Sequence, residues 1–318
     1  MRTLPFLIAI PFLLVAICLE AQFQDRLYPF RELTDEMRAR IDLKDGSVED
    51  WLEVLGEPTL TPLDFVIPPW SPEYDPSSYD FRIWLAWHDA TDHLFVAAQI
   101  VDDYHLNEYD RYGDNLPPDG DAAMSFLVDG DLSGGMLSQG SFFEDNLYFC
   151  VQAQHYYAFA QTYSNDSNLH LKGVSDRDRT SWVHHLPYAD GGGAIVDSQP
   201  VLSVLEFHVT AFDRLIWDDV EQNVISELFA GKTIGFALAL ADRDTAWDDE
   251  VESGPPPVDS VHHLFGPGAS YDPSKTSTGL FRESDLWAHG ILLGADGGSD
   301  GTAVESVTWG RIKASLSE

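Results

Sequence analysis

Basic side chains are scarce in this chain, which holds 18 Lys and Arg against 53 Asp and Glu and has a formal net charge of -35. Repulsion from phosphate groups on that scale argues against nucleic acid as a partner and against an anionic membrane surface. Cations and neutral ligands remain, and so does the alternative that the charge serves solubility alone. The composition therefore favours a partner without negative charge.

Cysteine is almost absent, with only Cys18 and Cys150 in the sequence. Cleavage near Ala21 would remove Cys18 and leave a single thiol, which excludes an intramolecular disulfide. A mature chain of this length needs no disulfide, because about 75% of the unfolded surface can be buried in a core. Cys150 lies within the apolar segment Leu147–Val151, where we expect it to be a small buried side chain.

Apolar runs long enough to cross a membrane are lacking, since a spanning helix needs about 20 apolar residues. The longest run, Leu4–Leu19, is shorter, contains prolines and follows Arg2. Together with the small residue Ala21 it predicts a secretory signal peptide over residues 1–21. We therefore expect a secreted, periplasmic or cell-surface protein with no membrane span. Cys18 leaves lipoprotein anchoring open as an alternative.

Signatures of catalysis are lacking as well. The sequence contains no Gly-x-Ser-x-Gly elbow, no His-Glu-x-x-His motif and no Gly-rich phosphate loop. Pairs of carboxylates suited to glycoside hydrolysis can be chosen anywhere in so acidic a chain, so they do not identify an active site. The sequence thus predicts a protein that is not an enzyme, with an exported hydrolase acting on polysaccharide as the alternative.

What the sequence does contain is a series of strand-length apolar segments, separated by Gly, Pro, Asp and Asn. A series of strands with few helices between them predicts an all-β fold, an antiparallel β-sandwich of jelly-roll or immunoglobulin-like type with long loops and one or two short helices. The expected strands are Phe81–His88, His93–Val101, Ala122–Val128, Leu147–Gln161, Val201–Thr210, Thr233–Ala241, Leu286–Leu293 and Val304–Ala314.

Helices and loops complete the expected organisation. Apolar residues at helical spacing predict a helix over Phe212–Leu228, and a shorter helix is expected within Leu33–Ile41. Long polar loops are expected at Ser164–Gln199 and Asp242–Glu283. After the signal peptide at 1–21 we expect an N-terminal segment at 22–41 and one sandwich domain at 42–318.

Several segments occur in a characteristic order along the chain. They are Ile41–Trp51, Trp84–Ala98 followed by Val101-Asp102-Asp103, Asp119-Gly120-Asp121, Thr233–Asp244 and Trp309-Gly310-Arg311-Ile312. Taken together, these segments resemble the family 9 carbohydrate-binding modules and the wider group of DOMON-like sandwich domains, over about residues 42 to 314.

This resemblance implies a β-sandwich that binds glycans, is often stabilised by calcium, and holds a sugar between aromatic side chains. The apolar face of a sugar packs on an aromatic ring, and its hydroxyls need carboxylate or amide partners. Trp51 and Trp84 are expected in the core. The loops offer Trp70, Tyr74, Tyr79, Tyr109, Tyr112, Trp182, Tyr188, Trp247 and Tyr271. Of the candidates, the predicted carbohydrate-binding residues are Trp182, Trp247, Tyr109, Tyr112 and Asp242.

Metal binding is predicted from Asp-x-Asp spacing. Asp129 and Asp131 lie one residue apart before a Gly-rich turn, and Asp242 and Asp244 repeat that spacing. Two carboxylates so spaced can reach one hard cation at 2.3 to 2.6 Å. We therefore expect a structural calcium ion, with Asp129, Asp131 and Asp244 as metal ligands and no other cofactor.

The sequence as a whole predicts a secreted, non-catalytic protein that binds a poly- or oligosaccharide through loop aromatics and carboxylates. Besides the hydrolase, a surface interaction or structural sandwich without a small ligand remains as an alternative. Protein partners are not indicated by any motif.

Overall fold

The computed structural model describes residues 23–105, 123–137, 150–160, 169–171, 182–198, 200–216, 219–244, 259–271 and 279–296. Over these residues the chain is mostly β-strand, as predicted. Two short α-helices occur there, α1 (Asp35–Arg38) and α2 (Glu49–Leu55). The strands are β1 (Leu27–Glu32), β2 (Tyr79–His88), β3 (His93–Asp102), β4 (Ala123–Asp129), β5 (Gln154–Phe159), β6 (Leu169–Leu171), β7 (Ala189–Ser198), β8 (Val201–Thr210), β9 (Phe212–Arg214), β10 (Val224–Ile225), β11 (Thr233–Asp242), β12 (Ser260–Leu264) and β13 (Ala288–Leu293).

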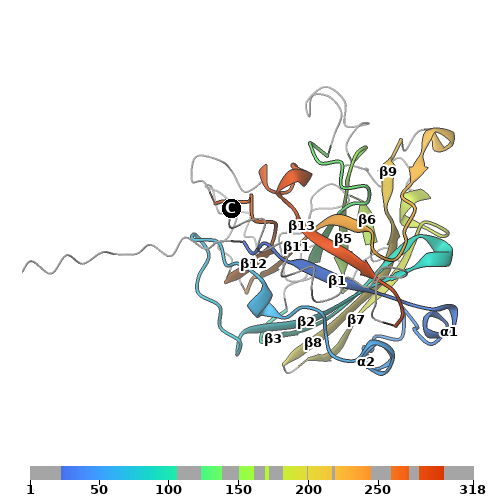
Figure 1. Cartoon of the computed structure of the whole chain (residues 1–318). Coiled ribbons are helices and arrows are strands. Elements are labelled where there is room, and N and C mark those ends of the chain that lie inside the picture. The colour runs from blue at the N-terminus through green and yellow to red at the C-terminus, as the bar shows by residue number, and fades with distance from the viewer. Residues whose placement is uncertain are drawn as a thin grey trace, which may run out of the picture.

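One eleven-stranded sheet dominates the described part of the chain (Figure 1), in the order β6-β5-β4-β11-β13-β1-β2-β3-β8-β7. The eleventh strand, β12, pairs with β11 on the same side as β13 but farther along the strand. All pairings are antiparallel except those of β1, which runs parallel to both β13 and β2. The sheet folds over so that β6 and β7, at the two ends of this order, lie in contact. The result is two packed layers joined through β1, the predicted all-β sandwich.

Side-chain alternation explains how the central strands form. In β2, Ile83, Leu85 and Trp87 face the interior of the sandwich, whereas Trp84 and Ala86 belong to a second buried cluster on the opposite face. Successive side chains of a strand point to opposite faces, so a strand buried on both faces reads as a nearly continuous apolar run. This is the pattern that made β2, β3, β8 and β11 recognisable in the sequence.

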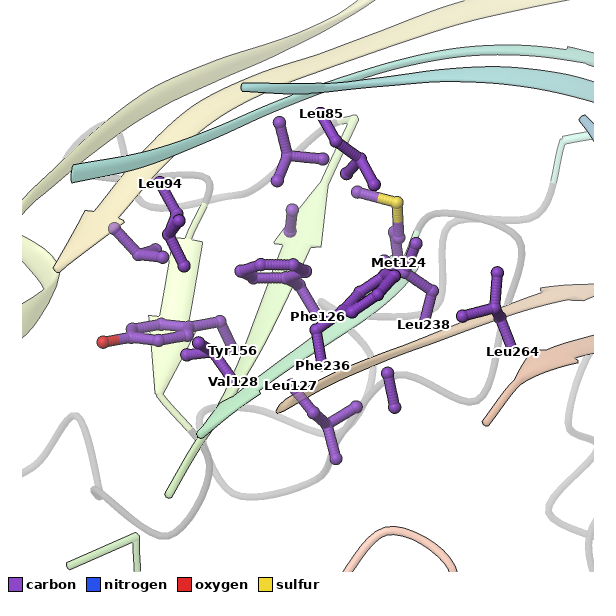
Figure 2. Close-up of a cluster of buried hydrophobic side chains, with 14 of the residues drawn as sticks. Leu85, Leu94, Met124, Phe126, Leu127, Val128, Tyr156, Phe236, Leu238 and Leu264 are labelled. Carbon is purple, nitrogen blue, oxygen red and sulfur yellow. The ribbon is translucent and has the colours of Figure 1, made fainter. Parts of the chain in front are cut away.

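The main core lies between the two layers. Figure 2 shows Leu85 of β2 and Leu94 of β3 pointing toward Phe126 of β4 and Tyr156 of β5. All four side chains are fully buried. Phe236 of β11 closes the other side of this core, with its ring edge-on to those of Tyr28 and Phe30 of β1, at centroid distances of 5.6 and 5.1 Å.

A second, smaller core covers the outer face of β2, β3 and β8. It is built by Leu33, Trp51 and Leu55 from the segment that carries α1 and α2, packed on Trp84 and Phe95. The indole Nε1 of Trp51 donates a hydrogen bond to Oε1 of the buried Glu206 over 2.7 Å. Trp51 and Trp84 are therefore core residues, as expected.

Most of the predicted strands are confirmed, with shifted ends. The segment expected at Leu147–Gln161 forms a strand only over β5 within the described residues 150–160. The segment Leu286–Leu293 begins with a 3-10 turn and forms β13 from residue 288. The strand expected at Val304–Ala314 lies outside the described residues. Cys150 is buried, as expected.

The predicted helix over Phe212–Leu228 is wrong. Its described residues form β9, a 3-10 turn at Val220–Gln222 and β10, and the two strands pair as a separate antiparallel ladder. Side-chain hydrogen bonds hold the backbone in this non-helical conformation. The amide of Gln154 accepts from the N–H of Phe212 and donates to its carbonyl oxygen, and Oδ1 of Asn223 accepts from the N–H of Ile216.

The short helix expected within Leu33–Ile41 is confirmed as α1, whose N-terminal Thr34 side chain accepts from the N–H of Met37. The two expected loops need correction, because β6 and β7 lie within Ser164–Gln199 and β12 lies within Asp242–Glu283. The segment 22–41 contributes β1 to the middle of the sheet. Among the described helices, none has the length and apolar character needed to traverse a bilayer.

Candidate functional site

The predicted Asp residues fall at opposite ends of the sandwich. Asp242 is the last residue of β11, and Asp129 is the last residue of the neighbouring antiparallel strand β4. The pairing register places Gly235, at the start of β11, against Asp129. The two pairs of carboxylates predicted to bind metal therefore lie at opposite ends of the sandwich and cannot share one ion.

Five aspartates from three strand ends meet at the Asp242 end, and we call them the aspartate cluster: Asp102, Asp103, Asp242, Asp244 and Asp259. Asp102 ends β3 and Asp259 precedes β12. Carboxylate oxygens of Asp102, Asp103 and Asp244 lie within 4.8 Å of one another, and so do those of Asp242, Asp244 and Asp259. Asp244 belongs to both groups and joins them into one cluster.

Local hydrogen bonds fix the positions of these carboxylates. Oδ1 of Asp102 accepts from the N–H of Tyr104, and Oδ1 of Asp103 accepts from the hydroxyl of Ser78. Asp259 accepts from the N–H of Asp244 over 2.8 Å. Carboxylate oxygens of Asp242 and Asp244 lie within 4.8 Å of each other, so these two side chains point to the same side. The backbone thus gathers acidic side chains on one side.

Two members of the cluster are deeply buried, Asp102 at 2% and Asp242 at 1% exposure. No donor among the described residues reaches Oδ2 of Asp102, Oδ1 of Asp242 or Oδ1 of Asp244. Burial raises the pKa of Asp102 to about 7, and the charges of Asp242, Asp244 and Asp103 add to this effect. Burial also raises the pKa of Asp242 to about 7, with contributions from Asp244 and Asp259. A buried carboxylate oxygen without a donor is costly unless a bound group satisfies it.

A second layer of residues supports Asp242. The hydroxyl of Ser260 donates to Oδ2 of Asp242 over 3.3 Å and lies 3.2 Å from Nε2 of His262. The buried imidazole of His262 packs against the rings of Tyr74 and Tyr79 at centroid distances of 5.1 and 5.8 Å. Burial lowers the pKa of His262 to about 4, so this imidazole is neutral at pH 7. These contacts hold Oδ2 of Asp242, whereas its buried Oδ1 has no hydrogen-bond partner among the described residues.

Two exposed aromatic residues belong to segments that contact the aspartate cluster. Tyr104, 53% exposed, directly follows Asp103 in the chain. Trp70, 55% exposed, has its ring 6.5 Å from that of His263 in β12, and the hydroxyl of the next residue, Ser71, accepts from the N–H of Val261. The segment from Trp70 to Ser78 is thus hydrogen-bonded to β12 through Ser71 and to Asp103 through Ser78. Exposed rings beside carboxylates are the combination that a sugar requires.

The other predicted metal pair, Asp129 and Asp131, stabilises a turn. Asp129 is fully buried, and its two oxygens accept from the N–H groups of Ser133 and Gly134. Burial raises the pKa of Asp129 to about 6, and a hydrogen bond with the carboxyl group of Asp131 adds to the effect. These donors already satisfy Asp129, which sets it apart from Asp102 and Asp242.

Trp182 lies far from the aspartate cluster. It begins a 3-10 turn (Trp182–His184), and its partly buried ring packs edge-on against Tyr188 and Phe212 at 4.6 and 6.0 Å. Tyr188 binds Thr210, and the register of β3 and β8 places Thr210 at the end of the sheet opposite Asp102. Trp182 and Asp242, predicted to share one site, are therefore not brought together.

Replacing Trp182 by Ala should lower the free energy of unfolding by about 2–3 kcal/mol, because the packed indole leaves a cavity. Glycan affinity should stay unchanged. Urea denaturation together with a binding titration checks both expectations. A variant with normal stability and no glycan binding would contradict this prediction and show that Trp182 belongs to the binding site.

Tyr109, Tyr112 and Trp247 lie outside the described residues. The structure adds Asp102, Asp103 and Asp259 to the residues expected at the site, together with Tyr104. Asp102 and Asp103 were visible in the sequence as part of the Val101-Asp102-Asp103 motif, and Trp70 as one of many loop aromatics. Their grouping depends on the meeting of β3, β11 and β12, which no local pattern reveals.

The aspartate cluster fits a hard cation by its donor chemistry. Oxygens that bind one calcium ion at 2.3–2.6 Å lie at most about 5 Å apart, and calcium takes 6–8 oxygen ligands. The two groups of three carboxylates meet the first condition. The unsatisfied oxygens of Asp102, Asp242 and Asp244 are suitable ligand atoms.

No protein-family model matches the sequence, and no curated protein matches it. The fold is similar to that of a family 9 carbohydrate-binding module from Caldicellulosiruptor kristjanssonii in complex with cellotriose, with 11% identity, a TM-score of 0.48, and coverage of 88% of this chain and 98% of the module. A glucose complex of a family 9 module from the same organism is similar with 11% identity, a TM-score of 0.46, and coverage of 84% and 96%. Both belong to the family that the sequence resembles. At such low identity the ligands of those modules do not assign a ligand to this chain.

Proposed function

We propose that this chain is a secreted carbohydrate-binding protein that holds a poly- or oligosaccharide at the aspartate-cluster end of the sandwich. The observation that carries the proposal is the exposure of Tyr104 directly after the exposed Asp103, together with the exposed Trp70 at the start of the segment that binds β12 through Ser71 and Asp103 through Ser78. A ring packs on the apolar face of a sugar, and a carboxylate accepts from its hydroxyls.

Binding without catalysis is part of the proposal. No nucleophile or acid with a defined partner geometry sets one member of the cluster apart from the others. The signal peptide predicted over residues 1–21, with cleavage near Ala21, supports the export that we propose, and extracellular polysaccharides are the glycans such a protein would meet. The strong negative charge favours neutral glycans over sulfated or uronic acid polymers, because like charges repel.

A glycan-binding screen of residues 22–318 tests the proposal, run with calcium and again with chelator. We expect saturable binding to at least one neutral glycan. Trp70→Ala and Tyr104→Ala should each raise the Kd by about tenfold, which corresponds to the loss of about 1.4 kcal/mol of ring stacking.

Phe229→Ala is the matched control, since Phe229 is 52% exposed. It follows Leu228, whose N–H binds Asp92 in the β2–β3 turn at the other end of the sandwich. Its affinity should equal that of the wild type. A folded protein that binds no glycan would refute the proposal, and release of soluble sugars from the glycans would show a hydrolase instead.

A further inference from the structure

Two stacked histidine rings lie on the outer face of the sheet, at the end opposite the aspartate cluster. His93 begins β3 and His208 lies in β8, and their rings are nearly parallel, with an interplanar angle of 9° and centroids 4.2 Å apart. His208 is 4% exposed, and neither nitrogen of its ring has a hydrogen-bond partner among the described residues. His93 is half-buried, and its ring binds the carbonyl oxygen of Pro187. Water could satisfy the ring of His208 only if the segment above it moved.

That segment carries α1, and we call residues 34–44 the α1 segment. The guanidinium of Arg38 lies 5.0 Å from the centroid of the Phe95 ring, and this ring lies 5.3 Å from the ring of His208. The positive charges of Arg38 and Lys44 both act against a proton on His208. The α1 segment therefore places two cations beside a buried imidazole.

Charged and titratable groups surround the stacked pair, but none among the described residues forms a hydrogen bond with His208. The register of β7 and β8 places Asp190 beside His208, yet Asp190 binds Lys44 over 2.5 Å. Asp35 of α1 contacts His88 of β2 over 3.1 Å. The groups that face the pair are Asp35, Arg38, Asp42, Lys44, His88, Asp190 and Glu206.

The carboxyl group of Glu206 supplies no countercharge in acid. Glu206 lies two residues before His208 in β8, so the two side chains point to the same face. Burial raises the pKa of Glu206 to about 8, which leaves its carboxyl group protonated and neutral in acid. A proton on His208 would therefore create a buried cation beside Arg38 and Lys44 without an anion bound to it, and such a charge is costly.

We propose that the stacked histidine pair is an acid-sensitive latch: when the rings of His93 and His208 bind protons, the α1 segment is released from the outer face of the sheet. Two imidazolium rings at stacking distance repel each other, and both are repelled by Arg38. Release of the segment lets water reach the rings and moves Arg38 away. The device is independent of glycan binding.

The α1 segment can be released locally, because it is held at both of its ends. On one side the N–H of Leu33 donates to the carbonyl oxygen of Trp87 in β2. On the other side Trp51 of α2 donates to the buried Glu206. Neither contact involves the histidine pair. The sheet and α2 therefore stay in place while the residues between these contacts separate from the sheet.

The direction of the pH dependence follows from where the protons bind. Burial lowers the pKa of His208 to about 2 and that of His93 to about 4 while the α1 segment is in place. Both values lie below the 6.5 of a histidine in water, so the pair favours the closed form fully above pH 6.5 and loses this contribution as the pH falls. His88 acts in the opposite direction, because a proton on its ring strengthens the contact with Asp35.

Hydrogen exchange of residues 22–318, followed by peptide mass spectrometry at pH 7 and pH 5, tests the latch. Each exchange rate is divided by the intrinsic rate at the same pH, which leaves the protection that the structure provides. We expect protection in the α1 segment to fall by about 100-fold, because each of two histidines contributes up to about tenfold per pH unit. The amides of β11 should remain protected at both pH values.

Neutral substitutions of the histidines should remove this response in steps. His208→Phe keeps an aromatic ring beside His93 but binds no proton, and it should reduce the loss of protection to about tenfold. His208→Gln is a second neutral variant that should give the same result if the larger ring does not fit. Addition of His93→Gln to either variant should leave protection in the α1 segment the same at both pH values.

His155→Phe is the matched control, since His155 is buried in β5 of the other layer, where its ring stacks on that of Phe281. It should keep the full loss of protection in the α1 segment. Three results would overturn the proposal: equal protection of the wild-type α1 segment at both pH values, a loss that both His208 variants retain, or a simultaneous loss in β11, which would show global unfolding by acid. The measurement contains no glycan, so it can succeed even if the glycan screen fails.

Discussion

Phe236→Ala should lower the free energy of unfolding by about 3–5 kcal/mol, because the ring fills the centre of the main core. Phe236 is fully buried and packs edge-on against Tyr28 and Phe30. Two neighbouring aromatic rings cannot collapse far enough to fill the space, since both are fixed by the parallel pairings of β1. Denaturant unfolding followed by tryptophan fluorescence measures the change.

Phe229→Ala is the control for this prediction, as the same substitution at a half-exposed position. It should change stability by less than about 1 kcal/mol. Equal losses at the two positions would mean that Phe236 does not occupy the packed interior that the fold gives it.

Glu206→Gln should change how stability depends on pH. Burial raises the pKa of Glu206 to about 8, opposed by the hydrogen bond from Trp51, while the charge of Asp50 adds to the rise. A folded pKa above the unfolded value near 4.5 means that Glu206 contributes stability fully at pH values below 4.5. This contribution is lost as the pH rises toward 8.

The Gln variant has no such loss, because an amide oxygen can accept from Trp51 without a proton being bound. Its stability relative to the wild type should therefore increase from pH 4.5 to pH 8 and then level off, by on the order of 3 kcal/mol. Unfolding curves of both proteins across this pH range check the prediction. Burial lowers the pKa of His208 to about 2 and that of His93 to about 4, but these groups titrate in both proteins and cancel in the difference. Parallel pH profiles would contradict the prediction.

The central strands could be predicted from the sequence because their side chains are buried on both faces. Strands β2, β3, β8 and β11 each present an apolar run of strand length, and their predicted ends differ from the observed ones by at most two residues. Nothing local to these runs, however, tells which strand lies beside which. The sequence did not predict the parallel strand β1, because Pro29 interrupts its apolar pattern.

Strand β7 was missed because three of its ten residues are glycines, which carry no side chain to show alternation. Gly192 is required by packing against the segment that precedes α2. A Cβ atom at Gly192 would lie 2.6 Å from the carbonyl oxygen of Leu43. What looks like a flexible loop in the sequence is thus a strand over which the backbone of another segment lies.

The candidate site could be predicted only in part, because spacing in the sequence shows which neighbouring residues can act together and not which strands meet. Asp242 and Asp244 share a visible Asp-x-Asp spacing, which also occurs at Asp129 and Asp131. Only the fold distinguishes them, because turn N–H groups satisfy Asp129 whereas Asp242 and Asp244 lie beside Asp259 from the start of another strand. A spacing motif reports the reach of two neighbouring side chains, and the site depends on five side chains from three strand ends.

The position of β1 between β2 and β13 has a consequence for how the chain is made. The strand at residues 27–32 is the first of the sheet to leave the ribosome, and its partner at 288–293 is the last described strand to appear. Until then one edge of β1 stays open, and so does the half of β11 that pairs with β13. A nascent or prematurely ended chain therefore exposes two unpaired strand edges, the state most prone to aggregate. Under the proposed export of this chain, these open edges would favour keeping it unfolded until synthesis and translocation are complete.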